Sequence, residues 1–155
     1  MKRNYEQTIK VIKSVIADET NFYANMANVS AILMAEFNFH WVGFYLVDKI
    51  QNNLVLGPFQ GPLACTRIPF GKGVCGSAWK ESKSFLVDDV HQFPGHIACS
   101  SLSNSEIVIP LIQNSGVIGV LDIDSCHYSD FDANDKLSLE IISSILSDSY
   151  ISGAF

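Results

Sequence analysis

One cysteine in a long polar segment is the first candidate for chemistry. Cys99 lies between Gly95 and Glu106, where small and polar neighbours predict partial exposure of the thiol. A reactive thiolate needs such exposure, although a free cysteine more often packs as a small buried side chain. His96, three residues earlier, could polarise the thiol. A histidine in a loop more often makes a structural hydrogen bond, so both interpretations of Cys99 and His96 stay open.

Acidic residues at the ends of two hydrophobic segments are the second candidates. Glu106 begins one segment, and Asp122 and Asp124 fall on one side of the next, because side chains alternate along a strand. Aspartate is uncommon in strands. If these carboxylates are buried together, repulsion and desolvation raise at least one pKa and retain a proton near neutral pH. The alternative is that Asp122 and Asp124 mark an exposed strand end before a turn.

The remaining cysteines do not follow a metal-binding pattern. The sequence contains four cysteines, and Cys65, Cys75 and Cys126 complete the set with Cys99. Their spacing includes no C-x2-C or C-x4-C pair, so no structural zinc site is predicted. The segment 71–76 matches G-x-G-x-x-G but lacks the acidic residue and the βαβ context of a dinucleotide site. We therefore expect no cofactor, and a tight turn that places Cys75 on a short helix.

Composition limits the protein class and its partners. A chain of 155 residues fits one domain spanning residues 1–155, and 48% hydrophobic with 17% charged residues predicts a packed core. The net charge of −6 and the lack of a dense Lys/Arg cluster argue against nucleic acid and anionic membranes as partners. The sequence has neither a membrane-spanning apolar run nor the apolar core of a signal peptide. A cytoplasmic location is therefore expected.

Hydrophobic periodicity predicts an α+β fold with a central antiparallel sheet and the N- and C-terminal helices packed on one face. Short turns between neighbouring strands favour the antiparallel arrangement. Residues 88–105 form a long irregular loop, which in a compact domain is usually functional or disordered. The expected helices span 5–37 (with a break near 18–21), 74–81 and 134–148; the expected strands span 41–47, 54–60, 66–70, 84–87, 107–113 and 117–124.

The terminal helices are predicted to be amphipathic. In the last one, Leu137, Ile141, Ile142 and Ile145 form the expected apolar stripe. Helices of this kind also make a homodimer an expectation.

Several segments together resemble the free methionine-(R)-sulfoxide reductases, a family with the GAF fold. The resemblance covers about residues 41–125 and rests on cysteines and carboxylates that match in register. The segments are 55–65 (VLGPFQGPLAC), 68–76 (IPFGKGVCG), 89–99 (DVHQFPGHIAC), 104–111 (NSEIVIPL) and 118–125 (IGVLDIDS).

The resemblance implies a role for each matched position. Cys99 falls on the family's nucleophile, and Cys65 and Cys75 fall on its resolving cysteines. The family acts on the free amino acid and is recycled by thioredoxin. Cys126 matches no family role. The positions implied to bind the substrate are Glu106, Asp122 and Asp124 for the sulfoxide, and Trp41 as an aromatic residue of the pocket. Tyr45 shares a strand face with Trp41, so it can pack with it on the methyl group of the substrate.

This chemistry is consistent with the residues. A sulfoxide is a poor electrophile until its oxygen is protonated, which a carboxylic acid of raised pKa can do while Cys99 attacks sulfur. The resulting sulfenic acid condenses with Cys65 or Cys75, and an external dithiol protein reduces the disulfide. Two alternatives remain at this point: a GAF-type sensor that binds a small ligand, and a thiol-based redox switch that does not depend on the carboxylates.

Overall fold

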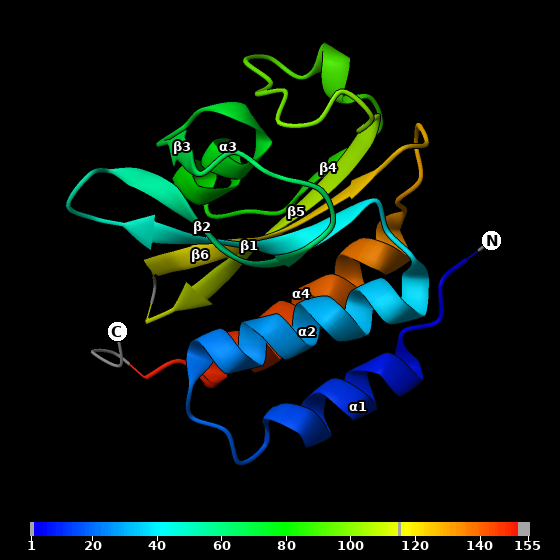
Figure 1. Ribbon diagram of the computed structural model, residues 1–155, viewed down its shortest axis with the longest axis vertical. Helices are drawn as coiled ribbons and strands as arrows, with labels where there is room; N and C mark the ends of the chain where they lie inside the picture. Colours follow the sequence, from blue (N-terminus) through cyan, green and yellow to red (C-terminus); the bar gives the residue numbers. More distant parts are fainter. Residues whose placement is uncertain (1, 115, 152–155) are drawn as a thin grey trace.

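The computed structural model describes residues 2–114 and 116–151. Helices and strands follow one another in the predicted order, with small shifts at their ends (Figure 1). The helices are α1 (Glu6–Ile16), α2 (Phe22–Phe37), α3 (Gly73–Glu81) and α4 (Ala133–Asp148), with a 3-10 turn η1 (Val90–Gln92); the strands are β1 (Trp41–Asp48), β2 (Asn53–Gln60), β3 (Arg67–Pro69), β4 (Phe85–Val87), β5 (Ser105–Gln113) and β6 (Gly116–Ser125).

Local sequence explains where the helices begin and end. The break between α1 and α2 ends at Asn21, whose side chain accepts a hydrogen bond from the backbone N–H of Ala24. Asp132 caps α4 in the same way, and the Asp135 side chain accepts from the Asp132 N–H, which completes a capping box. The predicted break and the predicted cap are both confirmed.

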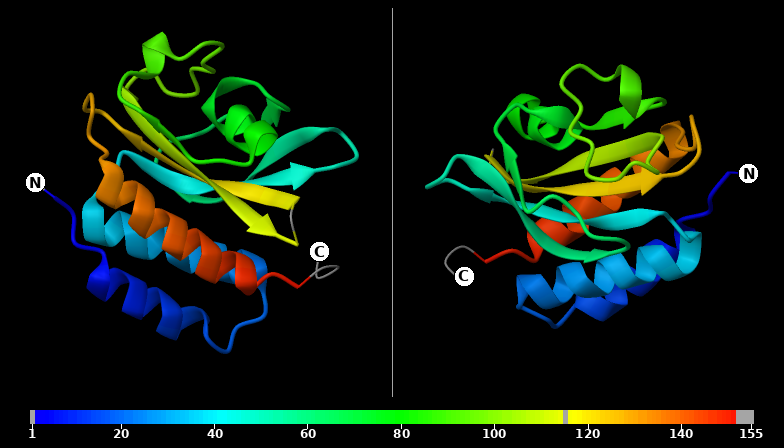
Figure 2. Two further views of the ribbon diagram at one scale, coloured as in Figure 1. Left: turned by 180° about the vertical axis from the view of Figure 1, so that it is seen from behind. Right: turned by 45° about the horizontal axis from the view of Figure 1, so that its top comes forward.

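The strands form one six-stranded sheet in the order β3-β2-β1-β6-β5-β4, with every neighbouring pair antiparallel. Helices α2 and α4 cover one face, and α1 packs outside them (Figures 1 and 2). Helix α3 and the long loop lie on the opposite face (Figure 2). The expectation of an antiparallel α+β sheet with its terminal helices on one face is confirmed.

Two hydrophobic clusters result, one on each face of the sheet. The larger lies between the sheet and the terminal helices, and the smaller lies beneath α3. The expected stripe on α4 is partly wrong: Leu137 is 63% exposed and Ile141 is 49% exposed, whereas Leu139, Ile142 and Leu146 are buried. The buried residues still recur with the helical period, but the buried side of the helix is rotated away from the predicted stripe. No helix among the described residues is long and apolar enough to cross a membrane.

Candidate active site

Strand register brings the three predicted carboxylates together. In the β1–β6 ladder, Asp122 lies opposite Gly43 and Asp124 lies opposite Trp41. In the β5–β6 ladder, Glu106 lies opposite Asp124. Because strand side chains alternate, these groups project to the face that carries α3, and all three carboxylates line one pocket.

The carboxylates of Glu106, Asp122 and Asp124 form the floor of the pocket, and burial changes their acidity. Glu106 and Asp122 are each only 6% exposed, and Asp124 is partly buried, so the interpretation of an exposed strand end is wrong. Burial raises the pKa of Asp122 to about 6, and the neighbouring Glu106 and Cys75 side chains partly offset this increase. Burial, and after it the charge of Asp122, raises the pKa of Glu106 and of Asp124 well above their usual range. The floor therefore holds protons at higher pH than exposed carboxyls do.

Cys75 belongs to the same buried cluster. It lies in α3, which begins at Gly73 directly after the turn, as predicted. Its Sγ–H donates to Glu106 Oε1 at 3.9 Å. Burial and the nearby Asp122 and Glu106 raise the pKa of the Cys75 thiol well above its usual value. Cys75 is therefore a protonated thiol at neutral pH, with low nucleophilicity.

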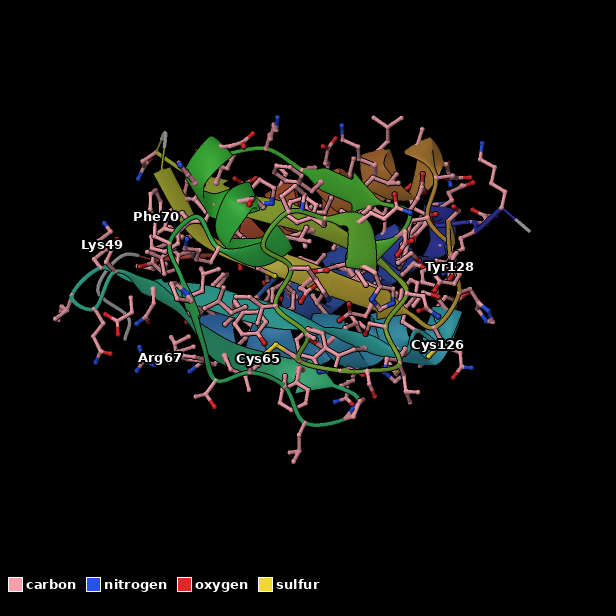
Figure 3. The ribbon with its side chains drawn as sticks, turned by 90° about the horizontal axis from the view of Figure 1, so that it is seen from above. Lys49, Cys65, Arg67, Phe70, Cys126 and Tyr128 are labelled. Atoms are coloured by element: carbon pink, nitrogen blue, oxygen red, sulfur yellow. A yellow bond between two sulfur atoms is a disulfide. The ribbon has the colours of Figure 1, made fainter. Side chains whose placement is uncertain are left out.

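Cys99 and Cys65 form a disulfide bond at the mouth of the pocket. Their Cα atoms are 5.4 Å apart, and 34 positions of sequence separate them. Cys99 is exposed in the long loop and Cys65 is partly buried after β2. Figure 3 shows the sulfur–sulfur bond next to the labelled Cys65, with Cys126 well apart from it. Of the two predicted resolving cysteines, the structure pairs Cys65 with Cys99 and leaves Cys75 as a free thiol.

Two aromatic side chains of β1 fasten the segment that carries Cys65. Trp41 and Tyr45 are almost fully buried, and their stacked rings have centroids 6.0 Å apart. Trp41 Nε1–H donates to the carbonyl of Pro62 at 3.1 Å, and the Tyr45 hydroxyl donates to the carbonyl of Cys65 at 2.9 Å. Both rings also line the pocket, so one strand face shapes the pocket wall and holds the disulfide segment.

The loop histidines have different surroundings. His96 lines the pocket, and burial, with a smaller effect of His91, lowers the pKa of its ring, which favours the neutral form. His91 Nε2 pairs with the side chain of Asn104 at 3.2 Å, a structural contact. Neither histidine activates Cys99 here, because the Cys99 sulfur is bonded to Cys65.

Ser103 is a pocket residue that sequence reasoning missed. It is 4% exposed and lines the pocket, and its side chain slightly opposes the increase in the pKa of Asp124. One of several serines in a polar loop carries no distinguishing signal, because its burial depends on how the loop folds over the sheet.

Comparison with known proteins agrees with this geometry. The GAF domain family model matches residues 26–148. A free methionine-R-sulfoxide reductase of Escherichia coli (strain K12) is 46% identical over 136 residues, covering 87% of this chain and 81% of that protein. This chain belongs to the free methionine-R-sulfoxide reductase family. The predicted family and its GAF fold are thereby confirmed.

Two further proteins are similar to this chain over nearly its whole length. GAF domain-containing protein A of Dictyostelium discoideum is 54% identical over 145 residues, covering 94% of this chain and 91% of that protein. The crystal structure of the Neisseria meningitidis free methionine-R-sulfoxide reductase in complex with its substrate superposes with a TM-score of 0.94 at 51% identity. That match covers 97% of this chain and 92% of the other.

Proposed function

We propose that this protein reduces free methionine (R)-sulfoxide to methionine. The observation that carries the proposal is an exposed cysteine, Cys99, at the mouth of a pocket floored by three carboxylates of raised pKa. A nucleophile and a proton donor in one pocket are what sulfoxide reduction requires. The restriction to the free amino acid and the R epimer follows the names of the family members.

In the first step, the Cys99 thiolate attacks the sulfoxide sulfur while a carboxylic acid of the floor protonates the oxygen. The oxygen leaves methionine and ends on Cys99 as a sulfenic acid. The cysteine sulfur is oxidised by two electrons and the methionine sulfur is reduced by two. Glu106 and Asp124 are the proposed donors, because their pKa values are raised well above those of exposed carboxyls.

In the second step, the Cys65 thiol attacks the sulfenic sulfur, water leaves and the Cys65–Cys99 disulfide forms. Its presence in the structure supports Cys65 as the resolving cysteine. Cys75 is a weaker candidate because its thiol is buried and donates to Glu106. A dithiol protein of the thioredoxin type then reduces the disulfide, and the exposure of Cys99 favours such an approach.

Substrate selection follows from the pocket walls. Trp41 and Tyr45 offer stacked apolar surface for the methyl group and methylenes of the substrate. Asp122, a buried carboxylate of the pocket with a pKa raised to about 6, is the proposed partner for the substrate ammonium. A methionine sulfoxide within a polypeptide has no ammonium to offer, so this pairing selects the free amino acid.

The test is thioredoxin-coupled reduction of free methionine (R)-sulfoxide by wild type, Cys99→Ser and Cys126→Ser. We expect turnover in wild type and Cys126→Ser, and near-complete loss in Cys99→Ser. Full activity in Cys99→Ser would exclude Cys99 as nucleophile. A wild type that binds another small ligand but does not turn over would favour a sensor. Loss of reductase activity in Cys126→Ser with an intact fold would also contradict the proposed cycle.

Three broader features belong to the same proposal. The chain acts as one GAF-like domain over residues 1–155, in the cytoplasm, where dithiol reductants are available. The protein forms a homodimer, which the exposed apolar side chains of Leu137 and Ile141 on α4 support. Size-exclusion chromatography with light scattering tests the homodimer, and Ile141→Asp should weaken it.

A further inference from the structure

One buried cluster contains a thiol that the proposed cycle does not use. Cys75 Sγ and one carboxylate oxygen each from Glu106 and Asp122 lie within 4.8 Å of one another. All three side chains are buried, and they come from α3, β5 and β6. The sulfur and Glu106 Oε1 are 3.9 Å apart. The tertiary fold therefore brings together three possible metal ligands, one soft sulfur and two hard oxygens.

A second observation points to a ligand at this place. Asp122 Oδ1 is buried and has no hydrogen-bond partner among the described residues, and Asp122 lines the pocket. A buried carboxylate oxygen without a partner is costly, so it calls for one from outside the chain. The ion pairs found between described residues involve none of Cys75, Glu106 and Asp122.

We propose that Cys75, Glu106 and Asp122 form a binding site for a thiophilic divalent cation of the Zn²⁺ class. Three protein ligands leave a fourth tetrahedral position open toward the pocket, as in zinc sites that hold an exchangeable ligand. Zn–S and Zn–O bonds of about 2.3 and 2.0 Å place sulfur and oxygen about 3.5 Å apart in a tetrahedron. The separation of 3.9 Å between the sulfur and Glu106 Oε1 needs only a small contraction, and the Asp122 oxygen, which lies within 4.8 Å of both, must also move closer. Mg²⁺ and Ca²⁺ are disfavoured because they prefer all-oxygen ligands.

Metal binding replaces protons of the cluster with the cation. On binding, the Cys75 S–H bond breaks, a metal–sulfur bond forms and the displaced protons pass to solvent, with no change of oxidation state. The dication then offsets two of the three negative charges of the thiolate and the two carboxylates.

The consequence for activity is competition. The cation and the substrate would use the same carboxylates, so Zn²⁺ should raise the KM for methionine sulfoxide without lowering kcat. This consequence rests on the proposed function, but the binding itself does not. Sequence motifs with short spacing, such as C-x2-C, cannot detect this site, because its ligands at positions 75, 106 and 122 lie on separate elements.

The test uses the full chain with its Cys65–Cys99 disulfide intact, titrated with Cd²⁺ as a spectroscopic substitute for Zn²⁺. We expect an ultraviolet thiolate-to-cadmium charge-transfer band that saturates at a single metal ion per chain, and displacement of Cd²⁺ by Zn²⁺. Cys75→Ser should abolish the band. Glu106→Gln should keep the thiol but weaken binding at least about tenfold, since even the loss of outer-shell partners costs that much.

Cys126→Ser is the matched control, because Cys126 is the other free thiol and is exposed. It should keep the full band. A band that persists in Cys75→Ser and disappears in Cys126→Ser would overturn the proposal, as would Glu106→Gln binding with wild-type affinity. Because the titration measures no turnover, an inactive wild type that still shows the Cys75-dependent band would contradict the proposed function and not this site.

Discussion

The mouth and the floor of the pocket differ in burial, and each suits a different part of the chemistry. At the mouth, Cys99 is exposed and joined to Cys65 across two irregular segments. At the floor, Glu106 and Asp122 are 6% exposed and held by two central strands. A sulfur that must meet a protein reductant needs access, whereas an acid that must keep its proton needs burial. The contrast agrees with the proposed roles of Cys99 as nucleophile and of the buried carboxyls as acids.

The largest expected effect concerns the cysteine pair at the mouth of the pocket. Cys65→Ser leaves the proposed nucleophile, Cys99, in place but removes the thiol that is proposed to condense with its sulfenic acid. We expect a single turnover that releases one methionine per protein, and near-complete loss of thioredoxin-coupled turnover. Rapid-quench measurement of methionine, with and without thioredoxin, checks this. Cys75→Ser is the comparison: if it, and not Cys65→Ser, blocks recycling, the assignment of the resolving cysteine is wrong.

The next effect tests the floor. Asp124→Asn and Glu106→Gln keep the shape of the pocket but remove an acidic proton. We expect kcat to fall by about 10²–10⁴-fold for whichever residue donates the proton, the usual contribution of general acid catalysis. In wild type, the rate should decline as pH rises through the raised pKa of that donor. Thermal unfolding of both variants is the control. If both retain wild-type kcat, neither Glu106 nor Asp124 supplies the proton.

The floor should also affect stability in a pH-dependent way. Folding raises the pKa of Asp122 from 3.8 to about 6, mainly through burial. The folded state therefore binds this proton more tightly, and the resulting stability is complete below about pH 4 and is lost as pH rises through 6. Asp122→Asn removes the titration.

We expect the decrease in unfolding free energy between pH 4 and pH 7 to shrink by on the order of 2–3 kcal/mol in Asp122→Asn, at 1.36 kcal/mol per pKa unit. Urea unfolding at several pH values measures it. The exposed Asp18→Asn variant serves as the control. An unchanged pH dependence in Asp122→Asn would mean that the carboxyl is not desolvated as the structure indicates.

The smallest effect concerns the connection between floor and mouth. Tyr45→Phe keeps the pocket wall but removes the hydrogen bond to the Cys65 carbonyl. A hydrogen bond worth ~1 kcal/mol corresponds to slower disulfide closure by about fivefold to tenfold. Trapping of the sulfenic acid should increase, while the first-step release of methionine stays unchanged. An equal loss in both steps would assign Tyr45 to substrate binding alone.

Much of this arrangement follows from local sequence. Strand alternation predicts that Asp122 and Asp124 share a face with Val120, and the turn at Gly73 predicts that Cys75 begins a short helix. The break at Asn21 and the cap at Asp132 are also local signals. They could be predicted because they depend on side-chain periodicity and on hydrogen bonds within a few residues.

Other features depend on where distant segments meet. The resemblance left Cys65 and Cys75 equivalent as resolving residues, and only the fold brings Cys65 to Cys99 across 34 positions. The strand-end interpretation of Asp122 failed for the same reason, since α3 and the long loop cover a face that the strand alone leaves open. The phase of the α4 stripe was wrong at Leu137 and Ile141 because packing against β5 selects the buried side.

The sequence by itself determined the elements, the strand faces and the resemblance to the reductase family, because these depend on residue type and short-range order. The tertiary structure decided which thiols pair, how deeply the carboxylates are buried and that Cys75 shares their cluster. Burial and proximity arise from contacts between residues far apart in the chain. The same contacts set the pKa values on which the proposed chemistry depends.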